Sequence, residues 1–329
     1  MVHFSEIIGQ EHIKEHLQGA IASGMLNHAY ILEGDRGSGK KSIAALFAMT
    51  LFCEQQGAEP CGKCHSCKQA LSGNHPDIRM LIPEKEDLIR VKEIREQLVN
   101  DVAIKPYSSE YKIYIIPEAE RMNTAAQNAL LKTLEEPPSY AIILLLCNNA
   151  SLLLETIRSR CVMLNIRPLR DEQIKEYLMT NRQVPDYQAK ICAAFARGSI
   201  GRALTLLQDD LFENMRDETV RMLRQIKAMD YAEIGKACRT ILERQTGVPE
   251  FLDFLNLWYR DVLLYKSSRR TDRLMFFEER KTIMAMAEES SYEGIEKILQ
   301  TITKTSDRLK ANVNGNTTLE LLLLTIKEN

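Results

Sequence analysis

A glycine-rich loop near the N-terminus constrains the fold of this chain more than any other feature. The loop covers residues 34–42 and reads GDRGSGKKS; it follows the apolar run 29–32 and precedes an apolar, helix-like run. A strand, a glycine loop and a helix in this order form a phosphate-binding loop, because backbone N–H groups, the helix N-terminus and a lysine then surround one anion. The sequence therefore predicts an α/β domain with a parallel sheet. The predicted phosphate-binding residues are Gly34, Gly37, Gly39 and Lys40.

The two positions that should hold magnesium both lack a side-chain oxygen. A phosphate-binding loop carries serine or threonine directly after its lysine, and this chain has Lys41 there. The apolar strand expected at 112–116 should end in aspartate, and it is followed by Pro117 and Glu118. A nucleotide bound here would have to hold its metal through phosphate and water alone. We therefore expect no Mg²⁺ site and no ATP hydrolysis by this chain, while ATP binding itself stays open.

Four of the eight cysteines lie in the short range 53–67, with the spacing C-x7-C-x2-C-x2-C. Four thiolates complete a tetrahedral shell around zinc and leave no open position, which is typical of a structural site. An iron–sulfur cluster is the alternative, but its usual run has a fourth cysteine three residues further on, and residues 68–76 contain none. We expect His75, next to a proline, to be a surface or turn residue. The predicted zinc ligands are Cys53, Cys61, Cys64 and Cys67.

The composition excludes several classes of protein. Lys and Arg number 43 against 45 Asp and Glu, a net charge of −2, which argues against a chain coated with positive charge for nucleic acid. No apolar run reaches the ~18–20 residues of a membrane span. The first residues show no basic and apolar signal-peptide pattern. Cysteines without an export signal are typical of thiols and metal ligands, so we expect a cytoplasmic location.

One further segment carries a family resemblance. Residues 119–138 read AERMNTAAQNALLKTLEEPP, which closely resembles the clamp-loader subunits of bacterial DNA polymerase III, members of the AAA+ superfamily. Within that family the pattern is most similar to the delta-prime subunits. The likeness is dense from residue 4 to about 206 and thin beyond. The other matching features, in chain order, are Gly9-Gln10, His28-Ala29-Tyr30, the cysteine insert, Ser159-Arg160-Cys161, 197–204 and 311–314.

The resemblance implies an architecture and partners. It implies an AAA+ domain in 1–166, with a parallel five-stranded sheet between helices and the zinc module at 53–67. A small helical lid would follow in 167–208, and an all-α oligomerisation collar in 209–329; helix-period apolar stripes after residue 168 agree with this. The implied partners are motor subunits (tau/gamma) and a delta subunit in a hetero-pentamer, with the sliding clamp and primed DNA reached through the complex and no membrane.

The resemblance also implies residue roles. Arg160 matches an arginine finger that enters the ATP site of the neighbouring subunit, and Arg158, two residues earlier, could share this role. Arg202 matches the sensor-2 arginine, and either Asn148 or Asn149 matches sensor 1.

The implied function is that of a non-hydrolysing, delta-prime-like subunit within the DNA-directed DNA polymerase III holoenzyme. The alternative is an ATP-hydrolysing, tau/gamma-like motor, which the residues at 41 and 117 speak against together. A zinc module that binds nucleic acid ranks last, because the cysteine insert has few basic residues and no aromatic residue for base stacking.

Overall fold

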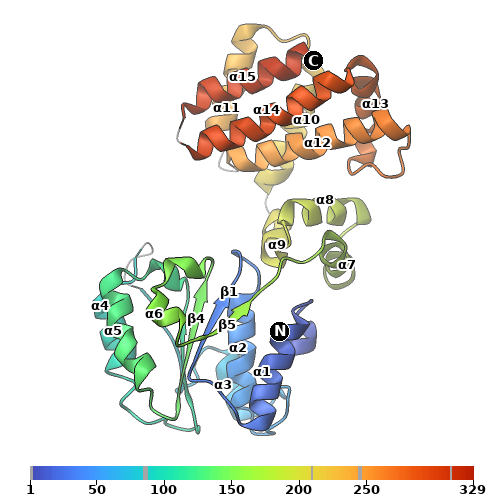
Figure 1. The fold of residues 1–329 in the computed structure, drawn as a ribbon. Coiled ribbons are helices and arrows are strands. Elements are labelled where there is room, and N and C mark those ends of the chain that lie inside the picture. The colour runs from blue at the N-terminus through green and yellow to red at the C-terminus, as the bar shows by residue number, and fades with distance from the viewer. Residues whose placement is uncertain (1–2, 84–87, 209, 244–246, 312) are drawn as a thin grey trace. The chain divides into compact units, whose positions relative to one another are not determined.

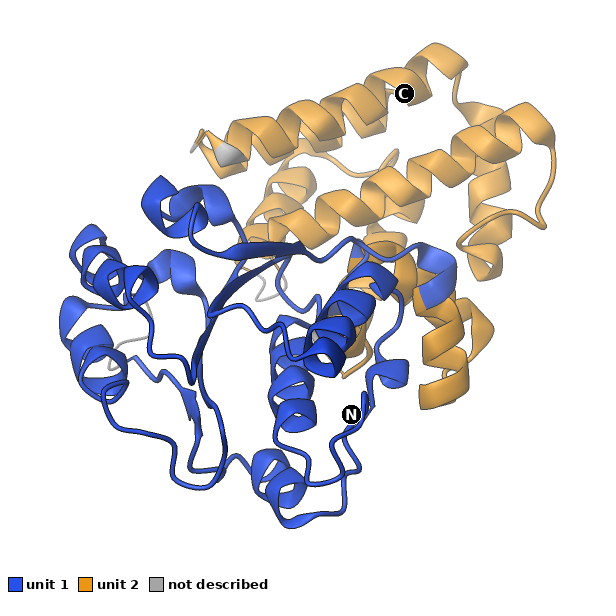
Figure 2. Ribbon diagram, turned by 60° about the horizontal axis from the view of Figure 1, so that its bottom comes forward, with its two compact units in different colours: residues 1–173, 197–202 blue, residues 174–196, 203–329 orange. Residues whose placement is uncertain are grey.

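The computed structural model describes residues 3–83, 88–208, 210–243, 247–311 and 313–329. The chain forms two compact units, shown in different colours in Figure 2. Unit 1 comprises Met1–Gln173 and Arg197–Arg202, and unit 2 comprises Ile174–Ala196 and Ala203–Asn329. The division into three domains at 166/167 and 208/209 stays a prediction.

Unit 1 is built on a five-stranded parallel sheet with the strand order β2-β3-β4-β1-β5. The central strands β3 and β4 are buried along their whole length, as their continuous apolar sequences require when helices cover both faces of a sheet. The predicted fold class, a parallel five-stranded α/β domain between helices followed by a helical region, is confirmed. The strands are β1 Ala29–Glu33, β2 Ile78–Met80, β3 Lys112–Ile116, β4 Ala141–Cys147 and β5 Val162–Asn165.

Helices cover both faces of this sheet (Figure 1). Alternate residues of β1 point to opposite faces, so Tyr30 joins the core under α1, α2 and α3, and Ile31 joins the core under α4 and α5. Two separate apolar cores therefore fix the sheet between its helices. The helices are α1 Glu11–Ser23, α2 Lys40–Leu51, α3 His65–Leu71, α4 Val91–Ile94, α5 Thr124–Glu135 and α6 Glu155–Arg158, with the short turns η1 Phe4–Glu6, η2 Arg95–Val99, η3 Ala119–Arg121 and η4 Ala150–Leu152.

The remaining elements are helical in the described residues. An aromatic cluster packs the core of unit 2: the ring of Phe254 lies 5.8 Å from that of Trp258 and 4.9 Å from that of Phe276. In the described part of the chain, no helix combines the length and the apolar character that crossing a membrane requires. The elements are α7 Asp171–Arg182, α8 Asp186–Ala196, α9 Ile200–Gln208, α10 Asp210–Gln225, α11 Tyr231–Glu243, α12 Val248–Ser268, η5 Phe277–Glu279, α13 Arg280–Glu289, α14 Tyr292–Lys310 and α15 Gly315–Glu328.

Candidate functional site

The glycine loop joins the end of β1 to the start of α2, as the sequence pattern predicts. Gly37 has a φ of 79° and Gly39 a φ of 95°, both in the left-handed region that only glycine adopts without strain. Gly39 is also the residue before the first turn of α2, where four backbone N–H groups have no partner inside the helix. The loop therefore has the backbone shape of a phosphate cradle.

Lys40, the lysine of this cradle, is bound to protein atoms. Its Nζ donates hydrogen bonds to the carbonyl oxygens of Gly34 and Asp35, the latter at 2.9 Å, and to Oδ1 of Asn148 at 2.9 Å. The side chain is 9% exposed, and burial lowers the pKa of its ammonium group, while the nearby Glu120 carboxylate acts in the opposite direction. The lysine thus holds the glycine loop to the end of β4.

The two asparagines after β4 have different environments. The Asn148 side chain accepts from Lys40 and donates to Oε1 of Glu120 at 2.6 Å. The Asn149 side chain turns away and accepts from the backbone N–H of Ser151 at 2.9 Å, which caps η4. Of the two positions that the sequence leaves open, the structure brings Asn148 to the glycine loop.

A cavity of about 370 Å³ lies beside the loop, and both positions that lack a metal ligand line it. Lys41 and Pro117 offer no oxygen there. Glu118, which also lines the cavity, pairs with Arg121 at 2.7 Å. The Ser42 hydroxyl also lines the cavity. One neutral hydroxyl is a poor replacement for the hydroxyl and carboxylate that an octahedral Mg²⁺ site normally uses.

Residues 197–202, which belong to unit 1, close over the same loop. The Ser199 hydroxyl donates to the carbonyl oxygen of Arg36 at 3.1 Å, and the Gly201 N–H donates to that of Gly37 at 3.0 Å. A Cβ atom added to Gly201 would lie 2.7 Å from the Gly37 oxygen, so this close approach requires glycine. The predicted sensor-2 residue, Arg202, therefore follows a segment that is bonded directly to the loop.

The four cysteines of the insert come together in one cluster. Their sulfur atoms lie within 4.8 Å of one another, and the Sγ atoms of Cys61 and Cys67 are 4.0 Å apart. Four thiolates around one zinc, with Zn–S bonds of ~2.3 Å, place their sulfurs ~3.8 Å apart, so the cluster fits a tetrahedral metal site. The ligand set that the sequence predicts is thus assembled in space.

Backbone N–H groups favour the ionised form of this cluster. The N–H groups of Lys63 and Cys64 point at the sulfur of Cys61, at 3.5 Å and 3.3 Å, and lower the pKa of that thiol to about 6. Burial raises the pKa of the Cys67 thiol. A bound cation would overcome this burial cost, because metal coordination deprotonates a thiol.

His75 differs from the sequence-based expectation. It does follow a turn, but it is 4% exposed, so its expected surface position is wrong. Its ring stacks on Phe52 with 4.8 Å between centroids, Nδ1 accepts from the Asp77 N–H at 3.2 Å, and Nε2 donates to the Ser66 hydroxyl at 3.0 Å. Because Ser66 lies between two of the cysteines, His75 ties the cysteine module to the start of β2.

Asp77 anchors a second loop at the same place. Its carboxylate accepts from the Tyr107 N–H at 2.6 Å, from the N–H and hydroxyl of Ser108 at 2.9 and 3.0 Å, and from the Ser109 N–H at 3.0 Å. Burial opposes ionisation, but these hydrogen bonds outweigh it, so the pKa of the Asp77 carboxyl lies below its usual value. The carboxylate therefore fixes the loop that leads into β3.

The two candidate finger arginines sit at and just after the end of α6. Nη2 of Arg160 lies 2.8 Å from Oε1 of Glu135, and Nη1 donates to the carbonyl oxygen of Thr156 at 2.9 Å. The Arg160 side chain is 36% exposed. Arg158 is partly buried, and its Nε has no hydrogen-bond partner within the described residues. The arginine that is predicted to act on another subunit is thus held by its own chain.

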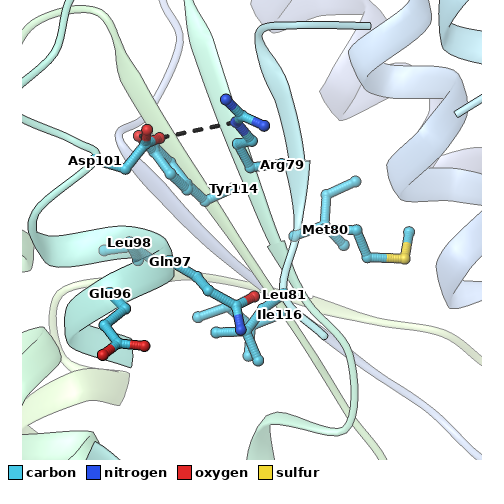
Figure 3. A pocket seen from close by; sticks show the side chains of 10 residues that line it. Arg79, Met80, Leu81, Glu96, Gln97, Leu98, Asp101, Tyr114 and Ile116 are labelled. Carbon is cyan, nitrogen blue, oxygen red and sulfur yellow. Dashed lines mark hydrogen bonds and ion pairs between the residues drawn. The ribbon is translucent and has the colours of Figure 1, made fainter. Parts of the chain in front are cut away.

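A second cavity, of about 310 Å³, lies between β2 and η2 (Figure 3). Nε of Arg79 lies 3.9 Å from a carboxylate oxygen of Asp101, which the dashed line in Figure 3 marks. The Gln97 side-chain amide donates to the carbonyl of Ile82 at 2.8 Å and accepts from its N–H at 3.0 Å. No predicted site residue lines this cavity in the described part of the chain, so it is separate from the glycine loop.

A parallel sheet of this order, a glycine loop of phosphate-binding shape after β1 and a helical second region define an α/β protein of the P-loop type. The family model "DNA polymerase III, delta subunit" matches residues 9–170, and "DNA polymerase III, delta subunit, C terminal" matches residues 215–328. The DNA polymerase III subunit delta' of Bacillus subtilis (strain 168) is 31% identical over 323 residues, which cover 97% of this chain and 96% of the relative. The chain therefore belongs to the delta-prime family of DNA polymerase III clamp-loader subunits.

The chain is also similar to other DNA polymerase III subunits. Subunit delta' of Pseudomonas aeruginosa is 30% identical and covers 90% of both chains. Subunit tau/gamma of Haemophilus influenzae is 38% identical over 209 residues, which are 62% of this chain and 30% of that relative. Among solved structures, a gamma subunit-related protein of Thermotoga maritima is 18% identical, with a TM-score of 0.46 and coverage of 97% and 98%.

Proposed function

We propose that this chain is a non-hydrolysing subunit of the DNA polymerase III clamp loader. It supports ATP-driven loading of the sliding clamp onto primed DNA and donates Arg160 to the ATP site of a neighbouring motor subunit. The observation that carries this proposal is the cavity beside the glycine loop, where Lys41 and Pro117 stand at the two metal-ligand positions. Without those oxygens, Mg²⁺ lacks the two protein ligands that normally orient the phosphates for hydrolysis.

The glycine loop then has a structural role. The Lys40 ammonium group donates all three of its hydrogen bonds to protein oxygens. Hydrogen bonds from Ser199 and Gly201 hold the carbonyl groups of Arg36 and Gly37 in the loop. In this proposal the loop keeps the shape of a nucleotide site without its turnover. The residues of this degenerate site are Gly34, Gly37, Gly39, Lys40 and Arg202.

Several features support Arg160 as the donated residue. A guanidinium stays charged at every physiological pH and grips phosphate oxygens with two parallel N–H groups. The side chain is partly exposed, at 36%, on a short segment that follows α6. An arginine finger supplied in trans raises the rate of GTP hydrolysis by ~10³–10⁵. A residue of this kind lets a subunit without its own turnover control the turnover of a neighbour.

The remaining proposals concern cofactor, partners and organisation. The cysteine cluster holds one structural zinc ion. The partners are tau/gamma motor subunits and a delta subunit in a hetero-pentamer, in the cytoplasm. Residues 167–208 act as the lid, and residues 209–329 form the oligomerisation collar.

The test measures ATP hydrolysis by the purified chain and by the reconstituted clamp loader. The chain alone should give background turnover, and magnesium-dependent hydrolysis by it would establish the alternative, a tau/gamma-like motor. In the complex, Arg160→Ala should slow hydrolysis by ~10-fold or more and leave assembly intact, and Arg158→Ala tests whether the second candidate arginine shares this role. Loss of assembly with Arg160→Ala would make that residue structural, and an equal effect of Arg158→Ala would show a shared role.

A further inference from the structure

We propose that Glu135 is a resting partner that holds Arg160 inside its own subunit and thereby restrains ATP hydrolysis in the neighbouring one. The inference rests on the proposed function of Arg160 and adds a regulatory residue to it. Glu135 is the last residue of α5, and Arg160 follows α6, so the contact joins two residues that are 25 positions apart in the chain.

The Glu135 carboxylate contacts the guanidinium nitrogen of Arg160 that is used in both modes of two-point phosphate binding. A guanidinium grips an oxyanion through two parallel N–H groups, either on its Nη1/Nη2 edge or on its Nε/Nη2 edge. Nη2 belongs to both edges, and it is the nitrogen 2.8 Å from the Glu135 carboxylate. Nη1 is bonded to the Thr156 carbonyl at 2.9 Å. A phosphate that approaches either edge therefore meets a nitrogen whose nearest oxyanion is already the Glu135 carboxylate, and the negative charge of Glu135 competes with the phosphate for the guanidinium.

The position of Glu135 in its helix supports a specific role. A helix carries partial negative charge at its C-terminus, so an acidic residue in the last turn is unfavourable unless a cation compensates it. Glu135 ends α5, whose last turn also contains Lys132, and Nη2 of Arg160 lies 2.8 Å from the Glu135 carboxylate. A carboxylate at this end of a helix is stabilised by a nearby cation, and Arg160 is the cation that another segment of the chain supplies.

The exposure of the pair makes the contact reversible. The side chains of Arg160 and Glu135 are 36% and 50% exposed, so water screens their attraction. An exposed ion pair of this kind changes an equilibrium by about two- to fivefold. The ion pair with Glu135 therefore weakens the binding of Arg160 in the neighbouring ATP site but does not prevent it.

The experiment compares variants of this chain in the reconstituted complex with the motor subunits and saturating Mg²⁺-ATP. Glu135→Gln should raise kcat for ATP hydrolysis about two- to fivefold, because the neutral amide releases the guanidinium more easily. Glu135→Asp keeps the charge and should stay close to the parent rate. Glu136→Gln, on the exposed residue directly after α5, is the matched control and should leave kcat unchanged.

A double-mutant cycle separates this inference from the function on which it rests. In an Arg160→Ala background, Glu135→Gln should have no effect, because no guanidinium is left to release. An unchanged or lowered kcat with Glu135→Gln alone, or an equal gain in both backgrounds, overturns the role of Glu135. If Arg160→Ala itself leaves hydrolysis unchanged, the proposed function of Arg160 fails instead. Circular dichroism and assembly, equal for all variants, show that a change in kcat is not a folding effect.

Discussion

Lys40→Met tests whether the glycine loop is a structural element. Methionine keeps the unbranched apolar stem of the lysine and removes its ammonium group. Three acceptors then lose their donor: the carbonyl oxygens of Gly34 and Asp35 and the Oδ1 of Asn148. A hydrogen bond to a charged group contributes ~1.5–3 kcal/mol.

Two effects make the loss of stability smaller than the combined contribution of the three hydrogen bonds. Burial already disfavours the charged lysine, as the lowered pKa of Lys40 indicates. The released carbonyls also lie next to a cavity of about 370 Å³, where water can replace the lost donor. We therefore expect Lys40→Met to lower the free energy of unfolding of unit 1 by ~2–4 kcal/mol. Lys41→Met, on the exposed neighbour, should change it by less than ~0.5 kcal/mol.

Urea unfolding followed by two probes measures this difference. The single tryptophan of the chain, Trp258, is fully buried in unit 2, so its fluorescence reports that unit, whereas far-UV circular dichroism reports both. The circular dichroism transition of Lys40→Met should move to lower urea and the fluorescence transition should not. A shift below ~1 kcal/mol would refute the structural role of the lysine. Loss of ATP hydrolysis in the complex, with folding and assembly intact, would refute the claim that this loop does not take part in turnover.

Two further predictions concern the loops around β2. The pKa of Asp77 is lowered in the folded state, so its carboxylate stabilises unit 1 above pH ~4, and this stabilisation is lost as the pH falls through the lowered folded-state pKa. Asp77→Asn should lower the free energy of unfolding by ~2–3 kcal/mol near neutral pH, and the variant should lose less stability on acidification than the parent protein. Thermal unfolding at several pH values measures this, and an equal loss of stability in both proteins on acidification would contradict the prediction. The purified chain should contain about one zinc ion, lost in Cys61→Ser, and elemental analysis that finds iron would identify a cluster instead.

Local patterns in the sequence were sufficient for the main features of unit 1. Apolar runs of strand length predict β3 and β4, and the glycine loop predicts the turn into α2, because these depend on neighbouring residues. The cysteine spacing likewise predicts a cluster, since its ligands lie close together in the chain.

Contacts between distant residues could not be predicted in this way. Whether Asn148 or Asn149 meets the loop depends on the backbone direction after β4, which no residue pattern encodes. His75 is buried because Phe52 and Ser66, from other elements, enclose it. The contact of Arg160 with Glu135 is a further case, because the two residues are distant in the chain. In the sequence alone, Glu135 is equally consistent with a solvent-exposed helix end.

The chain passes between its two units three times, at 173/174, 196/197 and 202/203. No single cut of the polypeptide therefore yields unit 1 entire. A fragment that stops at residue 173 lacks the short return segment whose serine hydroxyl and glycine N–H bond to the carbonyl oxygens of Arg36 and Gly37. Proteolysis in α7 or α8 would leave this segment attached only through the rest of the chain, so the integrity of the glycine loop depends on a polypeptide that stays unbroken well beyond it.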